Sequence, residues 1–158
     1  MHWGLRLREA QLDDCELFFE WVNDLEVRKN ALNSKNIYWN EHKSWFEKAM
    51  SSLSSVKLFV GIDENDEAVG QIRFEKDGVK AVIDISVDSR FRQQGLGKQL
   101  LEQGIKRIEE FWQDVSFIEA VVKIGNASSQ RLFEAGGFKK SPDKNANGFH
   151  RFALKLRR

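Results

Sequence analysis

A short stretch of the chain, RQQGLG (Arg92–Gly97), places two glycines directly before an amphipathic helix. Glycines remove side chains where a turn tightens, so they leave the first N–H groups of the following helix open to a ligand. These unpaired donors, together with the helix dipole, favour a phosphate or a pyrophosphate. A tight strand-to-helix turn without any ligand would need the same glycines, so the hexapeptide alone leaves both interpretations open.

Two common phosphate-binding motifs do not fit this turn. The dinucleotide fingerprint needs a third Gly or Ala where Leu100 stands, and it follows a strand of a parallel βαβ unit. The Walker loop has a longer spacing and ends in a Lys-Ser/Thr pair, which is not present here. Neither type of site is therefore predicted.

The elements that must position the turn alternate between strands and helices. Period-two alternation predicts strands at Trp3–Arg8, Val56–Ile62, Ala68–Glu75, Lys80–Asp88, Ser116–Lys123 and Gly148–Leu156. Apolar residues three and four apart predict helices at Gln11–Trp21, Glu41–Met50, Leu96–Phe111 and Asn126–Ala135. Asn40 is expected to cap the second helix, and the polar stretch from Asn23 to Tyr38 to be a loop with one short helix. The three consecutive strands predict an antiparallel meander, and the whole order predicts an α/β fold with a mixed sheet covered on both faces.

Composition excludes several classes of protein. Lys and Arg total 25 against 24 for Asp and Glu, and the cations are scattered, so nucleic acid is not expected as a principal ligand. Apolar runs are too short to span a membrane, and the N-terminus lacks a signal-peptide core. The single cysteine, Cys15, rules out an internal disulfide and a cysteine-rich metal site. We expect one cytoplasmic domain over residues 1–158, with no nucleic-acid, membrane or metal partner.

Two segments resemble the acetyl-CoA signatures of the GNAT N-acetyltransferase superfamily. RQQGLG, between the strand IDISVD (Ile83–Asp88) and a helix with paired leucines, is similar to the R/Q-x-x-G-x-G/A motif. NASSQRLFEAGGF (Asn126–Phe138) is similar to the second signature, an Asn followed by a helix that ends in Gly-Phe. The order of the expected elements also matches over nearly the whole chain. The resemblance implies a single GNAT-like domain with about seven strands and about four helices, and acetyl-CoA as acyl donor.

The resemblance also assigns roles to particular residues. It implies that Arg92 adds positive charge and that the turn amides hold the pyrophosphate, namely those of Gln93, Gln94, Gly95, Leu96, Gly97 and Lys98. The pantetheine arm would pair like an extra strand with Ile85–Val87, in a gap between the fourth and fifth strands. An N–H near Val87 would stabilise the oxyanion that forms at the thioester. Asn126 and Ser129 would contact CoA, although Asn126 is equally suited to a purely structural N-cap.

The general acid that the family often carries has no counterpart in this sequence. A Tyr in the second-signature helix is replaced by Phe133, and the only tyrosine, Tyr38, lies in the N-terminal loop. Because a thiol ionises near pH ~8.5, the CoA thiolate is a tolerable leaving group without such an acid.

A general base is needed, because an alkylammonium must lose a proton before it can attack. Asp84 lies on the strand expected to flank the thioester and is the first candidate, and Glu119 on the next strand is the second. His42, near the expected acceptor mouth, is a weaker third. Each of these side chains also has a plain structural interpretation, as a solvated or hydrogen-bonded residue.

The acceptor is expected to be a small-molecule primary amine. The pattern Trp21-x-Asn23-Asp24, Arg28 and Glu41-His42-x-x-Trp45-Phe46, with VGQIRFE (Val69–Glu75), resembles GNAT enzymes that acetylate nucleotide-linked amino sugars in pseudaminic-acid-type pathways. It is also similar, less closely, to ribosomal-protein N-terminal acetyltransferases. The aromatic residues would suit a sugar nucleotide, or they could simply pack helices on the sheet. The alternative from another class is a non-catalytic acyl-CoA-binding or sensing module, and either protein could be a monomer or a homodimer.

Overall fold

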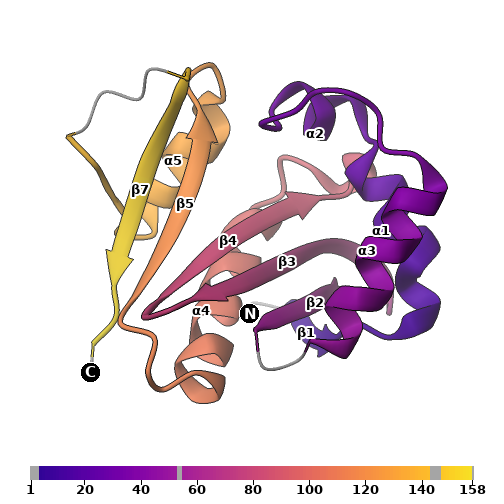
Figure 1. The fold of residues 1–158 in the computed structure, drawn as a ribbon, viewed down its shortest axis with the longest axis horizontal. Helices are drawn as coiled ribbons and strands as arrows, with labels where there is room; N and C mark the ends of the chain where they lie inside the picture. The colour runs from indigo at the N-terminus through magenta and orange to yellow at the C-terminus, as the bar shows by residue number, and fades with distance from the viewer. Residues whose placement is uncertain (1–3, 53–54, 143–146, 158) are drawn as a thin grey trace.

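The computed structural model describes residues 4–52, 55–142 and 147–157 of the chain, which form one seven-stranded sheet with five α-helices (Figure 1). The strands are β1 (Arg6–Glu9), β2 (Val56–Ile62), β3 (Ala68–Asp77), β4 (Lys80–Val87), β5 (Phe117–Lys123), β6 (Lys139–Lys140) and β7 (Phe149–Lys155). The helices are α1 (Cys15–Val22), α2 (Leu25–Lys29), α3 (Trp39–Ser51), α4 (Leu96–Phe111) and α5 (Ala127–Ala135), with single 3-10 turns η1 (Leu12–Asp14) and η2 (Ser89–Phe91).

The sheet is mixed, and its strand order is β1-β2-β3-β4-β5-β7-β6. All neighbouring strands are antiparallel except β4 and β5, which are parallel. Strands β2, β3 and β4 form the predicted meander. The expected α/β fold class is confirmed. Among the helices of the described residues, none is long and apolar enough to cross a membrane.

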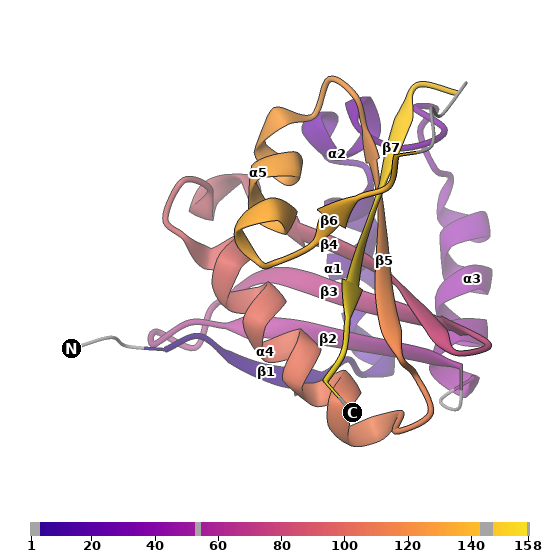
Figure 2. The ribbon, with the colours of Figure 1, turned by 90° about the vertical axis from the view of Figure 1, so that its left-hand side faces the viewer.

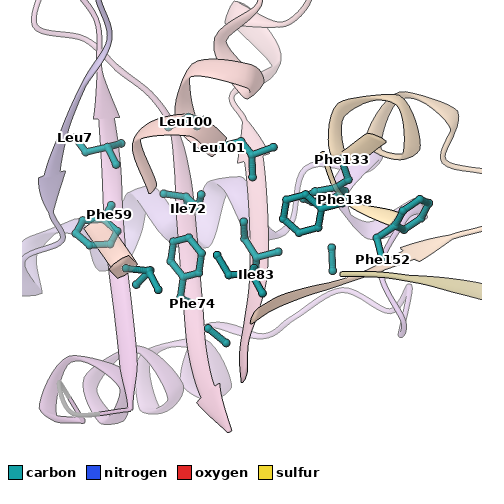
Figure 3. Packing of buried hydrophobic residues seen from close by; sticks show 14 of the residues in the cluster. Leu7, Phe59, Ile72, Phe74, Ile83, Leu100, Leu101, Phe133, Phe138 and Phe152 are labelled. Carbon is teal, nitrogen blue, oxygen red and sulfur yellow. The ribbon is translucent and has the colours of Figure 1, made fainter. Parts of the chain in front are cut away.

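Two hydrophobic clusters hold the helices on opposite faces of the sheet. Helices α4 and α5 cover one face and α3 the other (Figure 2). In the larger cluster, Phe59, Ile72 and Phe74 of the meander meet Leu100 and Leu101 of α4 (Figure 3). All five are almost fully buried, and each such side chain contributes ~1.5–3 kcal/mol of transfer free energy. The core therefore fixes α4, and with it the glycine turn, against β3 and β4.

A glycine brings α4 close to the sheet. A Cβ built on Gly104 would lie 2.5 Å from Cδ1 of Ile72 and 3.2 Å from the ring of Phe74. No side chain fits there unless these neighbours move, so this glycine serves packing rather than ligand binding.

The exposed edge of the sheet is covered by side chains of α4. Oε1 of Gln99 accepts the N–H of Leu5 at 3.1 Å, and Nε2 of Gln103 donates to the carbonyl of the same residue. One turn further on, Arg107 donates to the carbonyl of Leu7 at 2.9 Å. Residues four apart lie on one face of a helix. This row therefore occupies the backbone groups of Leu5, just before β1, and the carbonyl of Leu7 within it, which could otherwise pair with another chain.

The parallel neighbours β4 and β5 diverge, as Figure 1 shows. Their pairing consists of three positions at the start of each strand, and the last joins Val82 to Glu119. Beyond it β4 continues to Val87 and β5 to Lys123 without further pairing to each other. The last five residues of β4 therefore have a ladder partner on the β3 side alone.

Several expected boundaries differ from the structure. Helix α3 begins at Trp39 with Tyr38 as its N-cap, so the prediction of a cap at Asn40 was wrong. The extended backbone of Tyr38 leads directly into the helix, and its carbonyl accepts the N–H of His42 at 3.0 Å. The first strand begins at Arg6 rather than at Trp3, which lies outside the described residues. Strand β6 was missed because two exposed lysines show no apolar alternation.

Candidate active site

The end of β4 turns backbone groups toward the space that β5 has left. Asp88 donates its N–H to the carbonyl of Val69 at 2.8 Å, and Val87 lies opposite Gly70. In an antiparallel ladder this makes Val87 a non-hydrogen-bonded position, and Ile85, two residues earlier, is another. Their N–H and C=O groups therefore point away from β3. The structure thus presents a row of backbone donors and acceptors along the diverging edge of β4.

The turn that follows β4 lies at the end of this edge. Asp88 caps the single turn η2 by accepting the N–H of Arg90. Gln93 and Gly95 then have positive φ angles, 64° and 75°. This left-handed conformation costs glycine little, which explains the glycine at position 95. Gln93, Gln94, Gly95 and Lys98 are exposed, whereas Leu96 is half-buried against the larger cluster.

Gly97, the second glycine of the turn, is not explained by a positive φ angle. The φ of Gly97 is not positive, and a Cβ there would meet only the side chains of Leu132 and Val87, at 3.7–3.8 Å. At the start of α4 the N–H of Gln99 donates to the carbonyl of the N-cap Gly95 at 3.4 Å. The N–H groups of residues 96–98 therefore precede the helical ladder and are open to a ligand. The fold itself leaves room for a Cβ at Gly97, so the small residue there fits a phosphate that approaches the backbone.

Arg92 connects this turn to the N-terminal part of the chain. Its Nε donates to the carbonyl of Val87 at 3.0 Å, and its guanidinium forms an ion pair of 2.7 Å with Asp24. Both side chains are mostly buried, with exposed fractions of 31% for Arg92 and 21% for Asp24. The predicted role of Arg92 as a phosphate ligand stays a prediction. What the structure adds is a contact that sequence reasoning missed, because its two partners are far apart in the chain.

Asp88 joins helix α1 to the same turn. Its carboxylate accepts the indole N–H of Trp21 at 2.9 Å and contacts the guanidinium of Arg90 at 3.1 and 3.2 Å. Burial alone would raise the pKa of Asp88, but these hydrogen bonds lower it to about 2. Trp21 is buried and its polar atom is used, so the structural interpretation of this aromatic residue is confirmed. The pair fixes α1 against the end of β4.

The second-signature helix, α5, is capped at both ends. Oδ1 of Asn126 accepts the N–H of Ser129 at 3.2 Å, and its Nδ2 donates to Oγ of the same serine. At the other end Gly137, with φ of +92°, and Phe138 donate to the carbonyls of Glu134 and Phe133, at 3.1 and 2.9 Å. These two bonds form a Schellman motif. The N-cap role of Asn126 is thus shown, and the contact of Asn126 and Ser129 with CoA stays a prediction.

Phe133 lies in the core and not at the diverging edge of β4. Its exposed fraction is 4%, and its ring lies 5.1 Å from that of Phe138 and 6.5 Å from that of Phe152. The side chain of α5 that approaches the glycine turn is Leu132, beside Gly97. Phe133 faces away from the turn, so a proton donor at this position would not face a ligand bound there.

The candidate bases share the face of the sheet opposite α4. Ile83, Ile85 and Val87 join the cluster beneath α4, so the alternating Asp84 and Ser86 face the other side. Nε2 of the buried Gln71 donates to Oδ2 of Asp84 at 2.9 Å and to Oγ of Ser86 at 3.1 Å. The side chain of Asp84 is about half exposed, at 52%. A bound amine could therefore reach a carboxylate that Gln71 holds in place.

Glu119 also faces this side, but another charge engages it. It lies opposite Val82, at the last paired position before β4 and β5 diverge. Its Oε1 contacts Nζ of Lys80 at 3.4 Å, and only 16% of its side chain is exposed. Asp84 also has a cation nearby, since its Oδ2 lies 3.9 Å from the guanidinium of Arg73. Its side chain is nevertheless far more exposed than that of Glu119, and this exposure favours Asp84 as a base that a bound amine can reach.

His42 and Tyr38 do not occupy the candidate site. His42 is buried at 3% exposure, and its Nε2 is 2.8 Å from the carbonyl of Cys15. Burial lowers the pKa of His42, although this hydrogen bond partly offsets the effect. The ring of His42 packs against Phe19 and Trp45, which favours its structural interpretation over a role as base. Its expected place near an acceptor mouth stays a prediction. Tyr38 is exposed at 71% and caps α3.

The side chains of Asn23 and Arg28 hold helix α2 and the loop after it in place. Asn23 exchanges two hydrogen bonds with the backbone of Ile37, at 2.9 and 2.8 Å. The guanidinium of Arg28 donates to three backbone carbonyls, those of Val22, Asn33 and Lys35. Burial lowers the pKa of Arg28, and the nearby charge of Asp84 partly offsets this. Arg28 thus places positive charge near the candidate base.

The sequence matches the family model described as acetyltransferase (GNAT) domain over residues 4–139. The chain belongs to this family. The match confirms the expected enzyme class, an acetyltransferase, and acetyl-CoA as the acyl donor. No curated protein sequence is a significant match to the chain.

Solved structures of acetyltransferases share the fold over almost their whole length. A spermidine N-acetyltransferase from Vibrio cholerae, in complex with CoA and spermine, superposes with a TM-score of 0.82 at 15% identity, covering 96% of this chain and 95% of that one. An aminoglycoside acetyltransferase in complex with ribostamycin and coenzyme A gives 0.80 at 16%, covering 96% and 93%. A ribosomal-protein alpha-N-acetyltransferase in complex with coenzyme A gives 0.79 at 14%, covering 97% and 94%. At such identities the likeness shows the fold.

Proposed function

We propose that the chain, acting as a single catalytic domain over residues 1–158, transfers the acetyl group of acetyl-CoA directly to a primary amine. One observation carries the proposal. The unpaired edge of β4 leads straight to an open glycine turn at the start of α4, so backbone groups that suit an amide-containing arm adjoin N–H groups that suit its phosphates.

The donor would be held mainly by backbone. Ile85 and Val87 supply N–H and C=O groups that point away from β3, and the N–H groups of residues 93–98 lie at the helix start. The carbonyl of Val87 already accepts from Arg92, which leaves the N–H of Val87 to polarise the acyl oxygen. Ser129 lies one turn before Leu132, on the side of α5 that faces the turn. Its hydroxyl is proposed to contact the CoA chain together with Asn126.

Acetyl-CoA supplies an acetyl thioester, whose carbonyl carbon bonds to the amine nitrogen while the carbon–sulfur bond breaks and the thiolate departs. Asp84 is proposed to take the proton that the ammonium form of the acceptor must lose, directly or through water. Gln71 and Arg73 both contact Oδ2 of Asp84, so Oδ1 and the exposed half of the side chain are proposed to meet the acceptor. Glu119 is the second candidate for this role.

No dedicated acid is proposed for the departing thiolate. Phe133 is buried in the core, and Tyr38 is an exposed cap of α3. Since a thiol has a pKa near ~8.5, a thiolate leaves without a strong proton donor.

The acceptor is proposed to be a small-molecule amine. Within this class, a nucleotide-linked amino sugar is the proposed candidate. Resemblance in the N-terminal third supports this acceptor, and so does the positive charge that Arg28 and Lys123 place near the diverging strands, because a nucleotide carries phosphates. Stacking lends less support than the sequence suggested, because Trp21 and Phe46 are buried and Trp45 lies 5.1 Å from the guanidinium of Arg73. A polyamine, an aminoglycoside or a protein N-terminus are the competing acceptors.

Release of free CoA thiol with a panel of amines tests the proposal. The panel contains a nucleotide-linked amino sugar, spermidine, an aminoglycoside and an N-terminal peptide, and mass spectrometry checks each for the added acetyl group. Acetylation of one amine in step with thiol release supports a transferase. Tight acetyl-CoA binding with no acetylated amine would instead support the alternative, a non-catalytic acyl-CoA-binding module.

A further inference from the structure

Helix α2 is too short to be stable on its own. It has five residues, Leu25–Lys29, and none of them is buried. An isolated helix of this length is unstable in water, so its position depends on contacts with the rest of the molecule. Two such contacts join it to the site. Lys123 at the end of β5 donates to the carbonyl of Lys29 at 2.8 Å, and Asp24 at the other end pairs with Arg92.

One carboxylate oxygen of Asp24 both caps helix α2 and pairs with Arg92. Its Oδ2 accepts the N–H groups of Glu26 and Val27, at 3.0 and 3.2 Å, and so caps the helix. The same oxygen accepts the guanidinium of Arg92 at 2.7 Å. The start of α2 is therefore bound to the residue that opens the glycine turn.

Arg92 also makes two contacts, one with Asp24 and one with the end of β4 beside the glycine turn. Its Nε binds the last residue of β4, Val87, and the three residues after it in the turn are exposed. A ligand that orders the turn would therefore also restrict Arg92. Because the guanidinium is planar and its donors form a rigid fork, restricting one donor restricts the other.

We propose that the Asp24–Arg92 pair is a positioning contact, which transmits donor binding at the glycine turn to helix α2. This inference rests on the proposed function, which places CoA at that turn. Helix α2 carries Arg28, whose charge lies near Asp84. Binding of the donor thus restrains the short helix that carries Arg28 beside the candidate base.

Hydrogen exchange of the α2 amides, measured with and without CoA, tests the coupling without knowledge of the acceptor. In the parent protein CoA is expected to slow exchange of residues 25–30 by about fivefold or more, because local opening of the helix becomes rarer. In Asp24→Asn the cap oxygen remains but the charge is lost. This variant is expected to lose most of the CoA-dependent slowing, while calorimetry shows a CoA dissociation constant within about threefold of the parent.

Two further variants make the result specific. Arg92→Lys keeps the charge but cannot bind Val87 and Asp24 in the same fork, so at saturating CoA it is also expected to lose most of the slowing of α2 exchange, whatever its effect on CoA affinity. Arg6→Gln removes an exposed ion pair with Asp66, remote from the site, and is expected to keep the full slowing.

The outcomes separate the inference from the proposal beneath it. If CoA binds but slows α2 equally in the parent and in Asp24→Asn, the coupling is refuted and the proposed function stands. If CoA does not bind the parent protein at all, the proposed function fails, and the inference fails with it. Tighter CoA binding by Asp24→Asn would also refute the inference, because it would show that Asp24 holds Arg92 away from the phosphates.

Discussion

Replacing Gly97 with valine tests whether ligand binding, rather than folding, requires a small residue at this position. The new Cβ would lie 3.7–3.8 Å from the side chains of Leu132 and Val87, which is ordinary van der Waals contact. Valine is also a slightly better helix former than glycine, by less than about 1 kcal/mol. The free energy of unfolding is therefore expected to stay the same or to rise slightly.

Acetyl-CoA binding is expected to weaken for the opposite reason. The branched side chain of valine would stand where a phosphate oxygen is proposed to approach the N–H groups of residues 96–98. Loss of one hydrogen bond to a charged oxygen costs about 1.5–3 kcal/mol, which raises the dissociation constant about 10- to 150-fold. Calorimetric titration with acetyl-CoA measures this constant, and urea denaturation measures the stability of the same sample.

Gly104 supplies a control on the same helix. A Cβ there would lie 2.5 Å from Ile72, so Gly104→Ala is expected to lose about 1–3 kcal/mol of stability through overpacking while its folded fraction binds acetyl-CoA normally. The reasoning is refuted if folded Gly97→Val binds acetyl-CoA as tightly as the parent protein does.

Three other changes test the proton chemistry and the fold around the turn. Asp84→Asn should slow single-turnover acetylation of the true acceptor about 100-fold at neutral pH, with partial recovery at higher pH as more amine is free base; an unchanged rate and pH profile would leave Glu119 as the candidate to test. Phe133→Tyr should not raise turnover, because its hydroxyl would be buried beside Phe138 and Phe152 and should cost about 1–3 kcal/mol of stability; faster thiol release would contradict this placement. The pKa of Asp88 is about 2 in the folded protein and near ~3.9 in an unfolded chain, so its ionised form stabilises the fold above pH ~4 and this stabilisation is lost as the pH falls toward 2. Urea denaturation across that range should show a flatter pH dependence for Asp88→Asn, and an unchanged slope would mean that Asp88 does not titrate in this way.

Local patterns were enough to predict the parts of the site that depend on neighbouring residues. The glycine turn, the apolar stripe of α4 and the cap at Asn126 each arise within a few residues, where side-chain period and capping preferences act directly. The meander was predictable for the same reason, since short turns join its strands. Capping preference failed at α3, where the extended backbone of Tyr38 precedes the helix and Asn40 lies inside it.

Long-range contacts could not be read from the sequence. The alternation of β4 and β5 continues past Val82 and Glu119, so nothing in the pattern marks where their pairing ends. The partner of Arg92, Asp24, lies in the loop after α1, and only folding brings the two together. Gln71 gave no distinct signal, because it alternates with apolar residues as Arg73 and Glu75 do, and its bond to Asp84 depends on the register of β3 and β4.

The central claim is that the unpaired edge of β4 and the glycine turn together hold the acyl donor. Titration of isotope-labelled protein with CoA, followed by the NMR signals of individual backbone amides, tests it most directly. The account predicts that saturating CoA shifts the amides of Ile85, Val87 and residues 93–98 and leaves those of β1 and β2 unchanged. Binding of CoA that shifted neither Ile85 nor Val87 would contradict it.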